Sequence, residues 1–465
     1  MKKHVLSYSN CNAGVYELGW AQGEMLSYIH TRDPDDLLYV TKFGSLDGGR
    51  VDVEGVLAAI RLTYESNDAL RTRYVCRDGR WLQEIMGSGD ISVAELSATS
   101  PQLEAAEVVA LLGPLSPEPG EVPVRVAVVT FEGRPTHVYL AIHHASVDNM
   151  GAEIACHEIC RRSLGLPVLT SSAWQPHQLV EFETSPPGRA LAERADGYHR
   201  TRFRDLAEFD VPPTDRVVTP LREYQLTSPA VVVAAQQISR RVNVSALSVT
   251  LATYCTVLSA RLSKDRFPLA LTSGNRFNPK LQMSIAKVAQ ASSLSVDAAV
   301  PTFEEFCRRT NNATLLAYRY GVYDPALMEN LYAEMKAEYG KEVFFPYLVN
   351  LNLTTPVEDA ESRSRQQRQI EAAFAVRPGE LRQLLDRGVC GARDPGDGVR
   401  FSDLTLDIYE FSEHADMRLR TDLAFFPDAD LQNILLSTER LLVEIACGSE
   451  ENEMKRLVEL VKRGT

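Results

Sequence analysis

The sequence predicts an α/β fold divided into two similar lobes, and three observations support this. The chain has 465 residues, more than the roughly 250–300 at which a single hydrophobic core stops growing. Strand-like and helix-like segments alternate along most of it. Hydrophobic residues make up 45% of the chain and charged residues 24%, as in ordinary folded proteins. We expect a first lobe over residues 1–165 and a second over residues 166–465.

Charge and termini exclude several classes of function. The chain carries 62 acidic and 49 basic residues, a net charge of -13, without a long basic run. Nucleic acid is therefore not an expected partner. The start Met1-Lys-Lys-His4 is followed by polar residues rather than by the apolar core of a signal peptide. No run approaches the roughly 20 apolar residues that span a bilayer. We expect a cytoplasmic protein that does not enter a membrane.

In the first lobe, the pattern predicts helices around a β-hairpin. Apolar residues at helical spacing predict a helix over Val53–Tyr64. Two apolar runs separated by a Gly-containing turn, Val124–Phe131 and Thr136–Ile142, predict the hairpin. A further helix is expected to begin just after Asp148 and to end at Gly165.

In the second lobe, helices and strands are predicted to alternate. A stretch rich in Pro, Ser and Gln over residues 165–187 is the predicted crossing between the lobes. A polar helix is expected over Leu191–Leu206, and the apolar run Ala230–Ala235 is predicted to be the strand that opens this lobe. The remaining predicted elements are a helix over Ala246–Leu262, strands over Phe344–Leu353 and Leu404–Tyr409, and helices over Asp428–Cys447 and Glu451–Arg463.

The cysteines indicate packing rather than a metal site. Eight cysteines are scattered along the chain, and only Cys156 and Cys160 lie close together. Four-residue spacing on a helix places both on one face, where small side chains are readily buried. A structural zinc site needs a second ligand pair, which the sequence does not show. We expect no bound metal.

The candidate reactive centre is the segment His143-His144-Ala-Ser-Val-Asp148. Of the nine histidines, only His144 is followed by Asp four residues later, and it stands where a predicted strand meets a predicted helix. Strand ends present side chains to clefts. The alternative is that Asp148 only caps the helix and the histidines are ordinary polar groups at a sheet margin.

An imidazole at this position suits proton transfer near neutral pH. The G-x-S-x-G pattern of a nucleophilic serine does not accompany it, so a covalent acyl-enzyme is not indicated. Direct attack of an amine or hydroxyl on an activated acyl donor is the simpler scheme, with His144 as base or orienting group.

Several segments, in order, resemble the motifs of nonribosomal peptide condensation domains. The segment 143–148 resembles their HHxxxDG signature, and Leu18-Gly-Trp-Ala-Gln22 resembles their opening L-S-x-x-Q motif. The other matching segments are Ala69–Tyr74, Trp174–Leu206, Gly274–Leu281 with its continuation to Asp297, and Leu419–Phe426. The resemblance extends from about residue 16 to residue 447.

This resemblance implies two lobes similar to chloramphenicol acetyltransferase, arranged as a V-shaped pseudodimer. It implies that His144 is the catalytic residue, with His143 in support. It makes Asp148 the structural partner of an arginine, for which Arg276 is the matching residue, although Arg276 could instead be a surface arginine beside a Pro turn. The glycine expected directly after Asp148 is replaced by Asn149, and Gly151 follows two positions later.

The resemblance also implies a donor and a partner. The donor is an acyl group on the phosphopantetheine arm of an acyl or peptidyl carrier protein, with no cofactor bound to the chain itself. The acceptor is a small molecule with an amine or hydroxyl. Arg71, Arg73 and the pair Arg161-Arg162 are candidates for a basic patch that docks the acidic carrier. The segments Asn275–Pro279 and Ala317–Pro325 resemble stand-alone members that acylate a finished small molecule such as an enediyne core.

Two other functions stay open from the sequence. The first is a coenzyme-A-dependent acyltransferase of the HxxxD group, although its D-F-G-W-G signature is absent. The second is a non-catalytic docking module that keeps the fold, which Asn149 in place of glycine favours and the retained pair of histidines disfavours.

Overall fold

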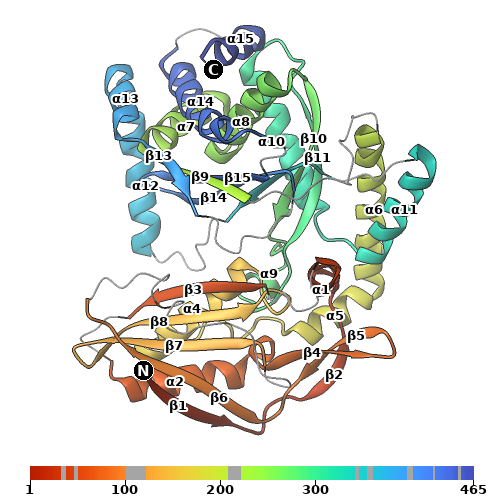
Figure 1. Cartoon of the computed structure of the whole chain (residues 1–465), viewed down its shortest axis with the longest axis vertical. Coiled ribbons are helices and arrows are strands. Elements are labelled where there is room, and N and C mark those ends of the chain that lie inside the picture. Colours follow the sequence, from red (N-terminus) through yellow and green to blue (C-terminus); the bar gives the residue numbers. More distant parts are fainter. Residues whose placement is uncertain are drawn as a thin grey trace. The chain divides into compact units, whose positions relative to one another are not determined.

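The computed structural model describes most of the chain (Figure 1). The described residues are 1–32, 38–46, 51–100, 108, 122–207, 221–340, 345–352, 360–394, 402–422, 425–448 and 452–464. They form two compact units. Unit 1 comprises residues 1–192 and Gly274–Gln290, and unit 2 comprises residues 193–273 and 291–465.

This division differs from the predicted boundary at residue 165. The Pro-rich stretch after it contains a helix, α5 (Pro176–Thr184), which packs against unit 1. Leu179 of α5 shares a small apolar cluster with Leu281, Ala286 and Val288. The chain therefore enters unit 2 along α6 (Pro186–Ala207), and Gly274–Gln290 returns to unit 1. Local composition indicated a break at residue 165 but could not reveal these contacts.

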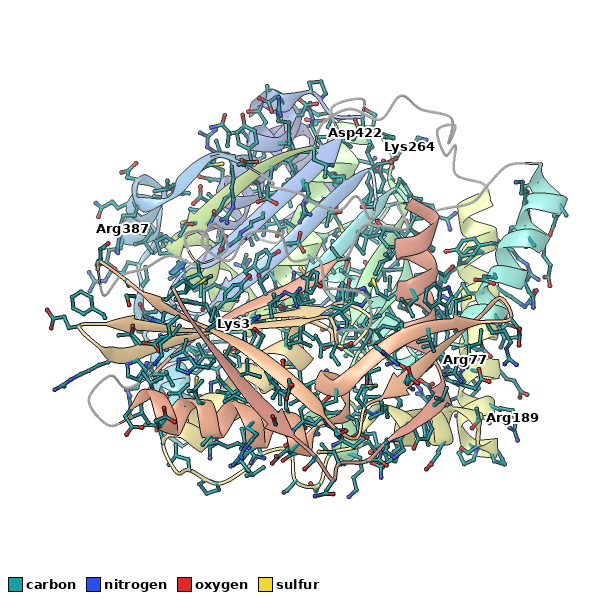
Figure 2. The ribbon with its side chains drawn as sticks, turned by 60° about the horizontal axis from the view of Figure 1, so that its bottom comes forward. Lys3, Arg77, Arg189, Lys264, Arg387 and Asp422 are labelled. Carbon is teal, nitrogen blue, oxygen red and sulfur yellow. The ribbon has the colours of Figure 1, made fainter. Side chains whose placement is uncertain are left out.

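Unit 1 is built on a five-stranded mixed sheet in the order β1-β6-β7-β8-β3. Its strands are β1 (Lys2–Tyr8), β3 (Tyr39–Ser45), β6 (Gly89–Ser97), β7 (Val124–Phe131) and β8 (Arg134–His143). A second, three-stranded sheet contains β2 (Gly14–Glu17), β4 (Thr72–Arg77) and β5 (Arg80–Ile85). Figure 2 labels Lys3 on β1 and Arg77 at the turn end of the β4–β5 hairpin.

The predicted hairpin is confirmed as β7 and β8, which pair antiparallel. Val138, Leu140 and Ile142 of β8 pack into one apolar cluster, whereas Tyr139 and Ala141 pack into another. The sheet therefore buries both faces, which explains the nearly continuous apolar run in β8.

Helices complete unit 1. They are α1 (Trp20–Arg32), α2 (Val53–Ser66), the 3₁₀ turn η1 (Asp68–Arg71), α4 (Asn149–Ser163), α5 and the short α9 (Pro279–Gln282). The helices α2 and α4 pack on each other and on the β8 side that carries Ile142. The predicted starts of α2 and α4 agree with the structure, because Asp52 and Asp148 each cap the helix that follows.

Unit 2 is built on a seven-stranded sheet in the order β11-β10-β12-β14-β15-β9-β13. Its strands are β9 (Leu221–Ser228), β10 (Arg266–Ser273), β11 (Gln290–Asp297), β12 (Tyr347–Leu351), β13 (Val389–Arg393), β14 (Leu404–Phe411) and β15 (Ala415–Asp422). Its helices are α7 (Pro229–Val242), α8 (Ala246–Leu262), α10 (Phe303–Arg319), α11 (Pro325–Tyr339), α12 (Ala360–Ala375), α13 (Pro378–Leu384), η2 (Leu385–Arg387), α14 (Asp428–Cys447) and α15 (Met454–Gly464). Both units are α/β, as predicted.

The predicted strand over Ala230–Ala235 is wrong, because these residues lie in α7. The side chain of Ser228 accepts a hydrogen bond from the Val231 N–H, and Pro229 occupies the first helical turn. This Ser-Pro start outweighs the β-branched run, since burial of one face against the sheet overrides intrinsic propensity. The expected strand and helix ends at residues 344, 353 and 451 lie outside the described residues.

The helices of unit 2 pack around a large apolar core. No single helix within the described ranges is long and apolar enough to span a membrane. Only α7 and α8 taken together pass that criterion, as a pair bent by 104°.

Candidate functional site: a histidine turn in unit 1

The candidate site lies where β8 ends and α4 begins. We call residues His143–Asp148 the histidine turn. Its backbone is held at several points: His143 N–H donates to the Pro123 carbonyl at 3.0 Å, and His144 N–H donates to the Leu38 carbonyl at 2.7 Å. Ser146 N–H closes the turn by donating to the His143 carbonyl at 2.9 Å. The histidines therefore sit on a rigid strand end, as the sequence predicts.

His144 presents one ring nitrogen as a hydrogen-bond acceptor. Its Nδ1 lies 2.8 Å from the Val147 carbonyl oxygen. Because a carbonyl only accepts, Nδ1 carries the proton in the neutral ring, and the Nε2 lone pair is left available. No residue in the described part of the chain hydrogen-bonds Nε2. The side chain keeps partial solvent exposure.

The surroundings of His144 keep it uncharged at neutral pH. Burial lowers its pKa to about 4, and the nearby Lys287 ammonium lowers it further, against the opposing pull of the Val147 carbonyl and Asp148. His144 is thus fully available as a hydrogen-bond acceptor near pH 7. It is a weaker base than an ordinary histidine, so its ability to orient a nucleophile weighs more than its basicity.

His143 is buried beside His144, at 3% exposure. Its Nδ1 accepts a hydrogen bond from Ala145 N–H at 3.3 Å. Its ring lies 5.6 Å from the ring of Tyr74 and 6.2 Å from that of Tyr39. These contacts hold the strand end in place and leave the outward position to His144.

Asp148 joins the histidine turn to residues Gly274–Gln290, which we call the Arg276 segment. The Arg276 Nη2 lies 2.7 Å from Asp148 Oδ1. Arg276 also donates through Nη1 to the carbonyls of Leu281 and Ser284, each at 2.8 Å. Arg276 is therefore a buried structural partner of Asp148, as the resemblance implies, and not a surface arginine. The cap is equally real, since Asp148 Oδ1 accepts from Gly151 N–H at 2.7 Å.

These partners keep Asp148 ionised. Burial alone would raise the pKa of its carboxyl, but the charges of Arg276 and Lys287 and the Gly151 N–H together lower it below its ordinary value. The other carboxylate oxygen accepts from the N–H groups of Val288 and Ala289, both at 3.0 Å. Such hydrogen bonds to the charged form stabilise it.

Asn149 does not strain the turn. It is the first residue of α4 and is not among the described residues with positive φ, so a glycine is not required there. The glycine that matters is Gly151. A Cβ atom on it would lie 2.7 Å from the carbonyl oxygen of Ala286, closer than real contacts allow. Its hydrogen atom lets the Arg276 segment approach the start of α4.

Sequence reasoning missed Lys287 and assigned no role to Tyr74. Lys287 is 5% exposed and stands in the apolar stretch Ile285–Ala289, where a lone lysine is the only signal. The Tyr74 hydroxyl lies 3.1 Å from Ser146 Oγ in the histidine turn. It also accepts a 3.4 Å hydrogen bond from Gln22 Nε2, which comes from the opening motif.

The predicted basic patch is wrong in part. Arg71 is 1% exposed and forms an ion pair with Asp68 at 2.6 Å, so it cannot contact a partner. Arg73 and Arg162 are bound to Glu84 and Glu158. A charged residue beside apolar ones can be drawn inside when a carboxylate and backbone carbonyls satisfy it.

The two neighbouring cysteines pack against the sheet. A Cβ on Gly44 of β3 would lie 2.5 Å from the Sγ of Cys156 and 2.9 Å from that of Cys160, so both thiols fill the space that the glycine leaves. Among the residues that the structure describes, no group of three or more His, Cys, Asp or Glu side chains could hold a metal ion.

The fold and the histidine turn together define the class. The chain has the fold of the condensation domains of nonribosomal peptide and polyketide synthetases. No family model matches the sequence. The structural similarity supports a function in condensation by acyl transfer.

Particular relatives are distant in sequence. The condensation domain of the Monacolin K polyketide synthase MokA has a TM-score of 0.72 at 15% identity, covering 96% of this chain and 100% of that one. The SgcC5 protein from Streptomyces globisporus, in complex with (R)-(-)-1-(2-naphthyl)-1,2-ethanediol and sucrose, has a TM-score of 0.67 at 15% identity, covering 92% and 98%. A subunit of the linear gramicidin synthase of Brevibacillus parabrevis is 25% identical over 321 residues, 63% of this chain, which spans 6% of that protein's length.

Proposed function

We propose that the chain is a condensation enzyme that transfers an acyl group from a carrier-protein phosphopantetheine thioester to an amine or hydroxyl of a small-molecule acceptor. The observation that carries this proposal is the geometry of His144. A rigid turn holds its ring, the Val147 carbonyl sets its tautomer at 2.8 Å, and Nε2 remains available. His143, Asp148, Gly151 and Arg276 support the turn rather than react.

The proposed step needs no oxidant or cofactor. The acceptor nitrogen or oxygen attacks the thioester carbonyl carbon, a C–N or C–O bond forms, and the C–S bond breaks. The acceptor proton passes to His144 Nε2 and then to the departing thiolate, which leaves as the phosphopantetheine thiol. General-base help contributes about 10²–10⁴ in rate, so positioning of the two substrates must supply much of the remainder.

The acceptor class is the finer part of the proposal. A small molecule with a free hydroxyl is supported by the similarity to SgcC5, which was crystallised with an aromatic diol. This agrees with the resemblance to stand-alone members that acylate a finished core, including enediynes. An amine acceptor would use the same geometry, because both nucleophiles can donate a hydrogen bond to Nε2.

The docking-module alternative rested on Asn149. Since Asn149 begins α4 in an ordinary helical conformation, it gives no reason to regard the site as damaged. The coenzyme A alternative shares the chemistry and differs only in the donor, so experiment must separate the two.

The test is an acyl-transfer assay by intact mass and chromatography. Carrier-bound thioesters and the matching coenzyme A thioesters are offered with pooled amines and alcohols to the wild type and His144→Ala. We expect product from carrier-bound donors, reduced about 10²-fold or more in the variant. Transfer from coenzyme A alone would assign the chain to the HxxxD acyltransferases. No product from either donor would favour the docking module.

A further inference from the structure

The Arg276 segment places a buried lysine beside the histidine turn. The flanking peptide groups of Lys287 are bound to one carboxylate: the Val288 and Ala289 N–H groups donate to Asp148 Oδ2, each at 3.0 Å. On the other side, the Ala286 carbonyl accepts from the Asp148 N–H at 3.3 Å. Lys287 therefore has its backbone fixed against the residue that ends the histidine turn.

The ammonium group of Lys287 is enclosed with it. The side chain is 5% exposed, and Nζ donates to the Ala289 carbonyl. Burial lowers the pKa of Lys287, while the carboxylates of Glu24 on α1 and Asp148 favour its charged form. Enclosing an ammonium group is costly unless opposite charges compensate it. An apolar side chain would fill the same space without that cost, so this lysine requires a reason other than packing.

The charge of Lys287 acts on His144. The titratable and charged groups around the histidine turn are His143, Asp148, Arg276 and Glu24, with Tyr74 bonded to Ser146. Asp148 would favour a charged imidazole, but Arg276 already engages it at 2.7 Å. After burial, repulsion by Lys287 is the largest influence on His144, ahead of the attraction of Asp148.

We propose that Lys287 is a positioning residue of the His144 site, whose buried ammonium group disfavours protonation of the imidazole and keeps the Nε2 lone pair available to the acceptor. The catalytic consequence rests on the role proposed for His144. With Lys287 charged, His144 remains a hydrogen-bond acceptor from neutral into acidic pH.

The test follows the imidazole itself and does not need the substrate. Histidine labelled with ¹³C at Cε1 is introduced into the full chain, and the His144 signal is assigned by its loss in His144→Gln. It is titrated from about pH 8 to about pH 4.5 in the wild type, Lys287→Met and Lys287→Arg. We expect the proton affinity of His144 to rise at least about threefold in Lys287→Met and to stay near the wild-type value in Lys287→Arg.

Internal controls separate this effect from damage to the fold. The signal of His199, which lies in unit 2, should titrate alike in all variants. If Lys287→Met does not fold, Lys287→Gln is read in the same way. A folded neutral variant whose His144 titrates like the wild type would overturn the proposal. In an active enzyme, the acidic limb of kcat/KM should move to higher pH with the His144 titration. A shifted titration without acyl transfer in any variant would refute the proposed function and leave the role of Lys287 intact.

Discussion

His144 in unit 1 and His199 in unit 2 are both neutral histidines in buried surroundings, yet their second ring nitrogens differ. Burial lowers the pKa of each to about 4. In both, a backbone carbonyl accepts from one nitrogen, Val147 for His144 at 2.8 Å and Tyr320 for His199 at 3.2 Å. The other nitrogen of His199 is bonded to Ser293 Oγ at 2.7 Å, whereas Nε2 of His144 has no partner among the described residues.

This difference separates a candidate reactive group from a structural one. His199 is 1% exposed, and so is Ser293, although a Ser-His pair would suggest a nucleophile and its base. A substrate cannot reach a pair enclosed in this way. A strongly lowered pKa therefore indicates burial in both places, and only a spare lone pair with access to solvent indicates chemistry.

The largest expected contrast concerns an arginine near each histidine. Arg276→Met should lower the free energy of unfolding by about 3–5 kcal/mol, because it leaves the Asp148 carboxylate buried without its partner. Arg200→Met should change it by less than about 1 kcal/mol, since the ion pair of Arg200 with Glu334 is exposed. Urea unfolding measures both. Equal losses would show that the Asp148–Arg276 pair is not specially stabilising.

The next contrast concerns pH. Below an unfolded-state pKa of about 6.5 the unfolded chain binds a proton at each histidine, but the folded chain does so only near pH 4. Stability should therefore be complete above about pH 6.5 and fall as the pH drops, by on the order of 3 kcal/mol for the fully enclosed His199. His199→Gln should remove this part of the slope, and His144→Gln a smaller part, in urea unfolding at a series of pH values. An unchanged slope in His199→Gln would contradict the assignment.

Two glycines sharpen the comparison further. Gly151→Ala should destabilise the protein by about 1–3 kcal/mol, because the new Cβ would meet the Ala286 carbonyl at 2.7 Å. Gly197→Ala, two residues before His199 on α6, meets nothing within 4 Å and should instead stabilise by about 0.5–1 kcal/mol. Thermal unfolding of both variants checks the opposite signs. Destabilisation by both would mean that the close approach at Gly151 is not the cause.

The smallest effect concerns two neighbouring serines of β11. Ser293→Ala should cost about 1 kcal/mol, because it leaves His199 Nδ1 buried without a donor. Ser292→Ala should be neutral or slightly stabilising, since Ser292 Oγ is buried and has no partner among the described residues. The free energies of unfolding of the two variants should differ in this order, and the reverse order would show that the Ser293 bond contributes nothing.

The sequence predicted elements best where local signals agree. The hairpin of β7 and β8, the helix α8 and the helix α14 follow from runs that carry one periodicity and clear breaks. Ala230–Ala235 failed because burial decided between helix and strand for a short apolar run. The assignment of Gly274–Gln290 to unit 1 rests on contacts with residues more than 100 positions earlier, which no local pattern contains.

The sequence by itself determined the chemistry that is available: the pair His143-His144, the cap Asp148 four residues later and an arginine in the matching segment. Only the tertiary structure decided which atoms of these residues can act. It bonded His144 Nδ1 to a carbonyl, enclosed Arg276 and Lys287 around Asp148, and made Gly151 rather than Asn149 the position that needs no side chain. The reason is that hydrogen-bond partners, burial and close backbone approach are properties of residues brought together across the chain, whereas a sequence pattern reports only residue type and spacing.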